Sequence, residues 1–292
     1  MAAALAAMGN ASLASPFQSS SLFINPATLA GMRSGDVYLM YNQLYPGIDV
    51  GHIGQGLIST GWPTRYGSFG FGVGTFAASG LKNERTISLA YAYPVHERVK
   101  LGLTGKQLYH GYSVGSDPLA SADPVFRDGT SQSTLSLDAG MVLSLSDPFE
   151  MALAVRNLNA PDVGLTSRDR VPREAQLGLA YSWSGVRFKA TADLAYRAAE
   201  YGTFKDKFVP SVGVEKSFEN DLFQLRAGAS PWEFTAGFGL KFGRYSFDYA
   251  MVLRRNLVAG YGNHLVGLRV EFGPGEEKSR RLTGLPPRQD KS

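Results

Sequence analysis

Cysteine is absent from the 292 residues, so disulfide bonds and cysteine-ligated metal sites are excluded. Histidine is scarce, and its four residues are spread over separate parts of the chain, which argues against a metal site. No apolar run of about 18 residues occurs, so the sequence predicts no transmembrane helix. The net charge is only +4, and no basic cluster is interleaved with aromatic residues, so we expect no nucleic-acid partner.

Signatures of catalysis are missing as well. No G-x-S-x-G motif lies on a strand-to-helix turn, where a nucleophilic serine needs it. The glycines of the stretch GFGVGTF are not enclosed in a βαβ unit, so they do not form a dinucleotide-binding fingerprint. We therefore expect neither an enzyme nor a bound cofactor.

Alternation of apolar and polar residues is what the sequence has in abundance. In the stretch 186–196, VRFKATADLAY, every second residue is apolar, and most residues between them are charged or polar. Successive side chains of a strand point to opposite faces, so such a strand has a different environment on each side. The pattern recurs along nearly the whole chain and predicts an all-β, up-and-down transmembrane β-barrel with lipid outside and a wet interior. A soluble β-sandwich is the alternative fold.

The alternation predicts about 14 antiparallel strands of roughly ten residues, the length that crosses a bilayer at a tilt. They are expected at residues 36–45, 53–61, 68–77, 85–93, 100–110, 133–145, 149–157, 175–183, 186–197, 207–216, 222–229, 233–242, 244–253 and 264–272. Connections alternate between tight turns, such as Trp62-Pro63 and residues 94–98, and longer loops. Bacterial outer-membrane barrels have short periplasmic turns, so both termini are expected in the periplasm.

The chain is expected to divide into an N-terminal segment (1–34), the barrel (35–273) and a polar, disordered tail (274–292). Residues 9–34 do not alternate, and we interpret them as a plug with short helical turns. The Ala-rich start before them resembles the last part of a signal peptide. The alternative is that it is a disordered N-terminus. Asn25, Pro26 and Ala27 are expected to form a fixed turn, because proline restrains its own φ and the preceding residue. Our hypothesis is that this plug gates the barrel.

Charged residues on the inward parity are expected to line the lumen, because an Arg or Lys facing lipid near the midplane costs about 2–4 kcal/mol. The candidates are Lys100, Lys106, Asp138, Arg156, Arg187, Lys189, Asp193, Arg197, Asp248 and Arg269. Two interpretations remain open: compensating ion pairs that fill the interior, or a pore lined for ions or substrate.

Three glycines, Gly70, Gly72 and Gly74, share one face of a predicted strand and form a smooth wall. This wall fits barrel curvature and close packing, a seat for the plug, or a weak place where a hydrophobic substrate leaves sideways.

Several short motifs add a resemblance to a known family. They are Asn25-Pro26-Ala27 after Met8-Gly9, the stretch 152–161 followed by Val171-Pro172 and 176–181, and Asp248-Tyr249-Ala250 before Gly262-Asn263-His264 and 266–272. In this order they resemble the PorV/PorQ family of the FadL-like outer-membrane superfamily. The resemblance implies a 14-strand barrel with an N-terminal hatch. It also implies either a type IX secretion component that escorts cargo to the surface or a fatty-acid channel.

The expected function is therefore transport or protein export across the bacterial outer membrane. A FadL-type channel for hydrophobic compounds and a structural barrel subunit of a surface or secretion assembly are the alternatives. The expected partners are outer-membrane lipid, secretion-system or surface-assembly proteins, and hydrophobic small molecules.

Overall fold

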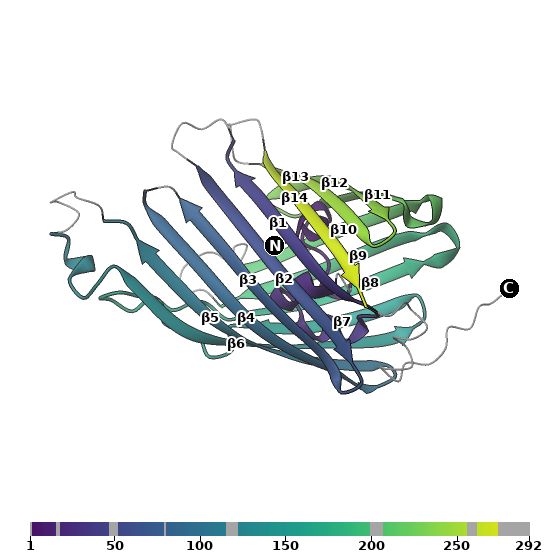
Figure 1. Cartoon of the computed structure of the whole chain (residues 1–292), viewed down its shortest axis with the longest axis horizontal. Helices are drawn as coiled ribbons and strands as arrows, with labels where there is room; N and C mark the ends of the chain where they lie inside the picture. The colour runs from purple at the N-terminus through teal and green to yellow at the C-terminus, as the bar shows by residue number, and fades with distance from the viewer. Residues whose placement is uncertain are drawn as a thin grey trace.

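Fourteen antiparallel strands form a closed barrel in the computed structural model, in which each strand pairs with its neighbours in sequence and β1 pairs with β14 (Figure 1). The structure describes residues 2–15, 18–46, 52–78, 80–114, 122–198, 207–255 and 262–273. The predicted strand number and the up-and-down topology are confirmed. The predicted disordered tail, residues 274–292, lies outside the described residues.

The strands run over β1 Gly35–Leu44, β2 Ile53–Thr64, β3 Gly67–Ala78, β4 Lys82–His96, β5 Val99–Tyr112, β6 Ser131–Ser146, β7 Phe149–Arg156, β8 Glu174–Trp183, β9 Phe188–Arg197, β10 Phe208–Phe218, β11 Phe223–Ala229, β12 Glu233–Phe242, β13 Tyr245–Arg254 and β14 Asn263–Phe272. The non-strand elements are α1 Ala3–Ala7 and the 3-10 helices η1 Gln18–Phe23, η2 Pro26–Gly31, η3 Pro124–Phe126, η4 Ser184–Val186 and η5 Glu219–Asp221. None of these described helices is long and apolar enough to cross a membrane.

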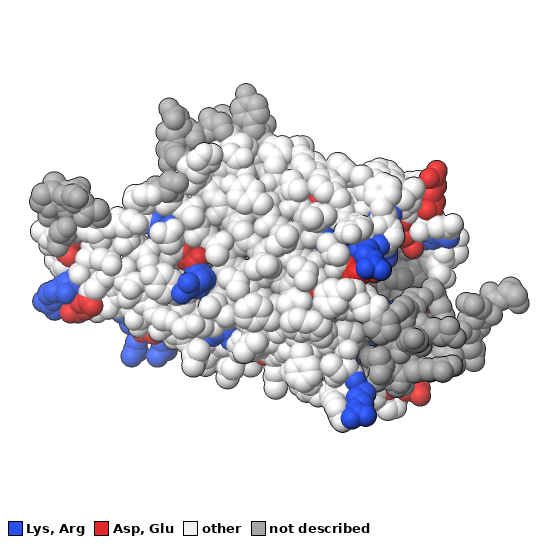
Figure 2. Space-filling view, in the orientation of Figure 1, with Lys and Arg blue, Asp and Glu red and all other residues white. Residues whose placement is uncertain are grey.

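The two faces of the strands differ as the alternation predicts. In β9, Leu194 is 44% exposed on the outer surface, whereas Asp193 is 5% exposed and faces the lumen. The same parity places Leu89 and Leu103 outside. Figure 2 shows a broad uncharged surface over the middle of the visible strands, with charged side chains gathered toward the ends. An apolar outer belt and a polar interior are typical of barrels that sit in lipid.

The barrel has a turn end and a loop end. Connections after even-numbered strands make the turn end, and those after odd-numbered strands make the loop end. The turn predicted at Trp62-Pro63 is wrong, because β2 continues to Thr64 and the turn lies at Arg65-Tyr66. The Thr64 hydroxyl closes this turn by donating to the Gly67 carbonyl at 2.7 Å. Likewise, β4 continues to His96 through a register shift after Pro94.

The N-terminal residues lie inside the barrel, where α1 is visible in purple (Figure 1). We call the described residues 2–15 and 18–34 the inner segment. The large side chains of Leu5, Met8, Leu13, Leu22 and Leu29 in this segment are at most 1% exposed. The Ala-rich start, for which the sequence suggested a signal-peptide remnant or a disordered end, forms the buried helix α1.

Helix α1 lies at the seam where the barrel closes. The seam is the antiparallel pairing of β1 with β14, which runs from Gly35 opposite Phe272 to Gln43 opposite His264. Helix α1 packs against β12, β13 and β14. The backbone N–H of Ala3 donates to the Tyr38 hydroxyl of β1 at 2.9 Å. The first residues of the chain therefore contact both sides of the seam.

Candidate functional site: the lumen and its inner segment

The inner segment rests on inward-facing glycines of the barrel wall. A methyl group built at Gly102 of β5 would overlap the backbone of Ala27, and one at Gly140 of β6 would overlap the Asn25 side chain. Only glycine permits such a close approach of two backbones. Other wall glycines whose added methyl group would meet this segment within 3 Å are Gly61, Gly70, Gly72, Gly178, Gly213, Gly228 and Gly237.

The predicted smooth wall belongs to this set of glycines, which we call the seat of the inner segment. Gly70 faces Leu29, and Gly72 faces the ring of Phe23, whereas a methyl group at Gly74 would have its nearest neighbour 3.9 Å away. Strand β3 keeps an unbroken register with β2 and β4 over its described length. The ladder therefore has no lateral gap beside these three glycines. Two of them act as a seat, and the sideways exit has no structural support within the described strands.

The predicted turn at Asn25, Pro26 and Ala27 is the N-terminus of η2. Asn25 caps this helix, because its Oδ1 accepts a hydrogen bond from the Ala27 N–H at 3.1 Å. Pro26 occupies the first helical turn, where its missing N–H is not needed. The Asn25 Nδ2 donates to the Leu13 carbonyl at 3.0 Å. The turn thus ties two distant stretches of the inner segment together.

Polar side chains of the wall hold the inner segment from several directions. Asp193 Oδ2 of β9 accepts hydrogen bonds from the N–H groups of Ser12 at 2.8 Å and Leu13 at 3.0 Å. Three strands along the wall, the Thr235 hydroxyl of β12 accepts from the Gly9 N–H and donates to the Ala7 carbonyl, both at 2.9 Å. Buried backbone groups need such partners, so these contacts stabilise the seated segment.

Asp36 of β1 holds a later stretch of the same segment. Its carboxylate accepts from the Ser19 N–H at 3.2 Å, and the Ser19 hydroxyl lies 3.0 Å from that of Ser59 in β2. The seat therefore surrounds the segment rather than supporting it on one side.

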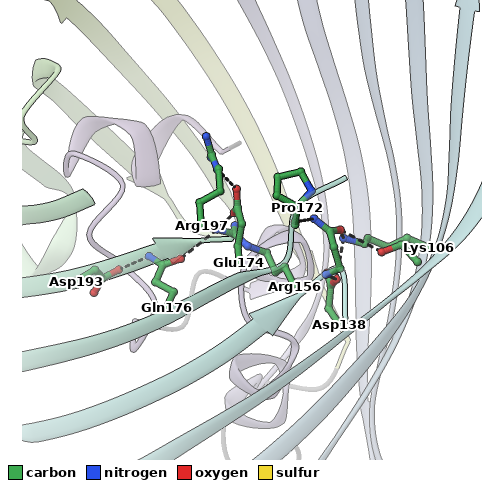
Figure 3. A network of polar contacts seen from close by, with 10 residues as sticks. Lys106, Asp138, Arg156, Pro172, Glu174, Gln176, Asp193 and Arg197 are labelled. Carbon is green, nitrogen blue, oxygen red and sulfur yellow. Dashed lines mark hydrogen bonds and ion pairs between the residues drawn. The ribbon is translucent and has the colours of Figure 1, made fainter. Parts of the chain in front are cut away.

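Five of the predicted lumen residues meet in one polar network (Figure 3). Arg156 donates to Glu174 at 2.6 Å, and Glu174 also accepts from Arg197 at 2.5 Å. The same Arg156 Nη2 lies 3.3 Å from Gln176 Oε1, and Gln176 Nε2 donates to Asp193 Oδ2 at 3.0 Å. This path connects the loop end of the lumen to the carboxylate that holds Ser12 and Leu13.

A branch of the network next to Arg156 involves Lys106 and Asp138. Their ion pair is 2.8 Å long, and both side chains are buried. Asn157 joins them, because its N–H donates to Asp138 at 2.9 Å and its Oδ1 accepts from Lys106 at 3.0 Å. Asn157 Nδ2 also donates to the Pro172 carbonyl at 3.1 Å, so the branch fixes both ends of the β7–β8 loop.

A second network lies toward the turn end. Arg226 of β11 is buried between Glu215 at 2.7 Å and Asp248 at 2.6 Å. Lys189 lies 3.7 Å from Glu215. These pairs support the interpretation of compensating charges inside the barrel.

The remaining predicted lumen residues lie outside these two networks. Arg269 lies 3.8 Å from Glu271, and Lys100 lies 3.6 Å from Glu150. Arg187 lies just before β9, which begins at Phe188 and not at the predicted residue 186, and it lines a cavity at the turn end of the barrel. Its guanidinium donates to Asn220 at 2.6 Å at the turn end.

Two cavities flank the inner segment. The loop-side cavity has a volume of about 600 Å³ and is lined by Gly9, Asn10 and Ile24 together with wall residues of the loop end. The turn-side cavity has a volume of about 920 Å³ and is lined by Gln18 and Arg33 together with wall residues of the turn end. The inner segment therefore lies between the two spaces.

Sequence reasoning missed several residues that carry these networks. They are Gln176, Glu215 and Arg226. Each has the inward parity of its strand; Glu215, for example, directly follows the outward Val214. The alternation along each strand could have identified them as inward-facing. It could not show which inward charges lie in contact, because that depends on the register between strands.

The fold, a closed 14-strand barrel, is similar to that of several solved transporters and channels. The toluene transporter TbuX of Ralstonia pickettii has a TM-score of 0.70 and 11% identity, with 94% of this chain and 98% of that chain covered. The toluene transporter TodX of P. putida has a TM-score of 0.68 and 15% identity, with 94% and 99% covered. A Pseudomonas aeruginosa FadL homologue has a TM-score of 0.59 and 14% identity, with 93% and 95% covered. Identities this low establish the fold alone.

The particular family follows from the sequence. The family model for the type IX secretion system membrane protein PorP/SprF matches residues 8–267, so the chain belongs to this family. No curated protein matches the chain. The likeness to a FadL homologue agrees with the expected barrel fold, and the family whose model matches is PorP/SprF, a relative of PorV/PorQ. The protein is thus an outer-membrane β-barrel of a type IX secretion system membrane-protein family.

Proposed function

We propose that this barrel serves type IX secretion as a membrane platform for partner proteins, with its own lumen closed and without catalytic activity. The observation that carries the proposal is the seated inner segment, whose Leu5, Met8 and Leu13 are buried inside the lumen. A polypeptide needs an open path, and the seated segment occupies the space between the two cavities. Cargo would therefore pass beside this barrel, through a partner, and not through its centre.

The proposed orientation places the turn end and both termini in the periplasm and the loop end at the cell surface, as in other outer-membrane barrels. The absence of cysteine allows a direct test with single substitutions. Ser167→Cys lies in an exposed part of the β7–β8 loop, and Glu97→Cys lies in an exposed turn. A membrane-impermeant maleimide should label only the first in intact cells. Labelling of only the second would reverse the orientation.

The partner proposal is tested by crosslinking in cells, purification in mild detergent and mass spectrometry. Secretion-system proteins should remain with the full barrel. Recovery of the barrel with lipid alone would contradict a platform role. The remaining candidate functions would then be a channel or a structural barrel.

The role of the inner segment as a gate is tested by its removal. We expect single-channel conductance in planar bilayers to rise when residues 9–34 are deleted from the full chain. The deletion removes the Asn25–Ala27 turn together with the side chains that separate the cavities. Unchanged conductance would contradict both the gating role of the inner segment and the closed lumen.

Passage of small molecules is the second candidate function. The loop-side cavity favours it, because aromatic and aliphatic side chains form part of its lining and it holds about 600 Å³. This volume lies within the usual range for small-molecule sites. Two structural neighbours are described as toluene transporters. Uptake of radiolabelled toluene by proteoliposomes, compared with vesicles that lack the barrel, tests this candidate.

A further inference from the structure

We propose that the loop-side cavity binds an aromatic carboxylate, and that binding loosens the hold of the wall on the inner segment. The lining contains four basic side chains, Arg156, Arg197, Lys207 and Arg254, and two acidic ones, Glu174 and Glu233. It therefore carries a surplus of two positive charges. A concave site with one predominant sign of charge concentrates counter-ions of the opposite sign.

The aromatic part of the ligand is inferred from the uncharged lining. Tyr45, Tyr196 and Trp232 line the same cavity as the four cations. Aromatic rings pack favourably against one another in offset or tilted arrangements. The cavity thus combines apolar surface for a ring with guanidinium groups for a carboxylate, and a neutral hydrocarbon would leave those cations without a new partner.

The carboxylate would enter at the Arg156–Glu174–Arg197 cluster. Glu174 accepts from both guanidinium groups, at 2.6 Å from Arg156 and 2.5 Å from Arg197. The Arg197 side chain is 56% exposed, so it is accessible to a ligand from the cavity. Arginine binds carboxylates through paired, charge-assisted hydrogen bonds, so a ligand carboxylate competes with Glu174 for the same donors.

Arg156 transmits this competition to the inner segment. Its Nη2 reaches Gln176 Oε1 at 3.3 Å, and the other end of the Gln176 amide donates to Asp193 Oδ2 at 3.0 Å. That oxygen is the acceptor for the Ser12 and Leu13 N–H groups. Figure 3 shows this path from Arg156 through Gln176 to Asp193. Movement of Arg156 toward a ligand would free Gln176 and weaken the polar contacts at residues 12 and 13.

The floor of the cavity belongs to the same stretch of the inner segment. The Asn10 side chain donates to Glu233 at 2.8 Å, and both residues line the cavity. The ligand site and the segment therefore share a surface as well as a hydrogen-bonded path. By linkage, a ligand that loosens the segment binds more tightly once the segment is loose.

This inference deepens the second candidate function and rests on it only for the entry of small molecules into this cavity. Binding is measured by the fluorescence of Trp232 in the full-length Trp62→Phe/Trp183→Phe background, with benzoate, the neutral isostere benzamide and toluene as probes. The inner segment is followed by maleimide labelling of Ser12→Cys, a position that is 3% exposed and whose side chain is outside the network. Only the Ser12 backbone N–H takes part in the bond to Asp193.

We expect benzoate to bind more tightly than benzamide or toluene and to accelerate labelling at position 12. Arg156→Gln should weaken benzoate binding about tenfold, the loss expected for one charge-assisted pair, and Arg156→Lys should lose less. Lys100→Gln, which removes a cation paired with Glu150 outside this cavity, should leave benzoate binding unchanged. Folding of each variant is checked by circular dichroism and heat-modifiable gel mobility.

Each alternative outcome would reject a defined part of the proposal. Preference for toluene would reject the anionic ligand but leave the channel candidate intact. Benzoate binding without faster labelling would reject the link to the inner segment. Equal losses in Arg156→Gln and Lys100→Gln would reject this cavity as the site. Absence of binding by all three probes would reject both the inference and the second candidate function, while the platform role would be judged separately by the crosslinking experiment.

Discussion

The side-chain oxygen of Asn25 occupies the space into which a side chain at Gly140 would project. Gly140→Ala should therefore push Asn25 away from the Ala27 N–H that it caps. Overpacking of this kind costs about 1–3 kcal/mol. Urea titration of the barrel folded in lipid vesicles measures the loss.

Gly105→Ala is the matched control for this substitution. Gly105 lies on the outer face of neighbouring β5, and a methyl group there would meet no atom within 4 Å. The free energy of unfolding should stay constant or rise by about 0.5–1 kcal/mol, since alanine restricts the unfolded chain. An equal loss in both variants would show that strand distortion, and not contact with Asn25, causes the effect.

Asp193→Ala tests a contact in which one wall carboxylate holds two N–H groups of the inner segment. The substitution removes the acceptor for the N–H groups of Ser12 and Leu13, which stay buried. Unsatisfied buried donors cost about 1–3 kcal/mol. Thermal unfolding in detergent should shift to a lower midpoint. The control is Asp128→Ala, an exposed carboxylate 4.0 Å from Arg127, which should change stability by less than about 0.5 kcal/mol.

Arg226→Met should destabilise the barrel by about 3–5 kcal/mol, because it leaves the carboxylates of Glu215 and Asp248 buried without their common cation. Denaturant unfolding in vesicles gives the value. A triple variant that also carries Glu215→Gln and Asp248→Asn should recover most of the loss. Arg127→Ala, at an exposed pair with Asp128, should cost less than about 1 kcal/mol. A small effect at Arg226 would mean that the turn-side network contributes little.

Local stability of the β7–β8 loop should fall in acid. Hydrogen bonds from the N–H groups of Asp169 and Gly164 to the Asp162 carboxylate lower the pKa of Asp162 below its ordinary value. The folded loop then binds fewer protons than the unfolded loop. Its extra stability is complete above the unfolded pKa and is lost as the pH falls through the folded pKa.

Amide hydrogen exchange at Gly164 and Asp169 measures this change. The protection factors should drop between about pH 5 and about pH 2, the range in which aspartates titrate. Asp162→Asn keeps an acceptor oxygen but cannot titrate, so its protection should not depend on pH over the same range. A parallel drop in this variant would assign the change to another group.

Local alternation was sufficient to predict the strands, because a period of two is visible within each strand without any knowledge of its neighbours. Leu194 and Asp193 fall on opposite faces for that reason alone. Strand ends were harder to predict. Pro63 suggested a turn, but the outward Trp62 and the hydroxyl of Thr64 extend β2 beyond it.

Contacts within the lumen depend on register, which the sequence does not display. Arg226 meets Asp248 two strands away, so the pairing requires the alignment of β11, β12 and β13. Helix α1 has no side-chain cap and only five residues, too few for stability in isolation. It forms because the inner wall supplies packing partners, and no local pattern could have indicated them.

Helix α1 and the Ala3 contact to Tyr38 give the seam between β1 and β14 a particular dependence on chain order. These two strands are neighbours in space, but all the other described strands lie between them in sequence. The earliest residues span the junction that the latest strand completes. Contacts of α1 on both sides of this pairing therefore stabilise the closed ring, so loss of the inner segment should weaken the barrel first between β1 and β14.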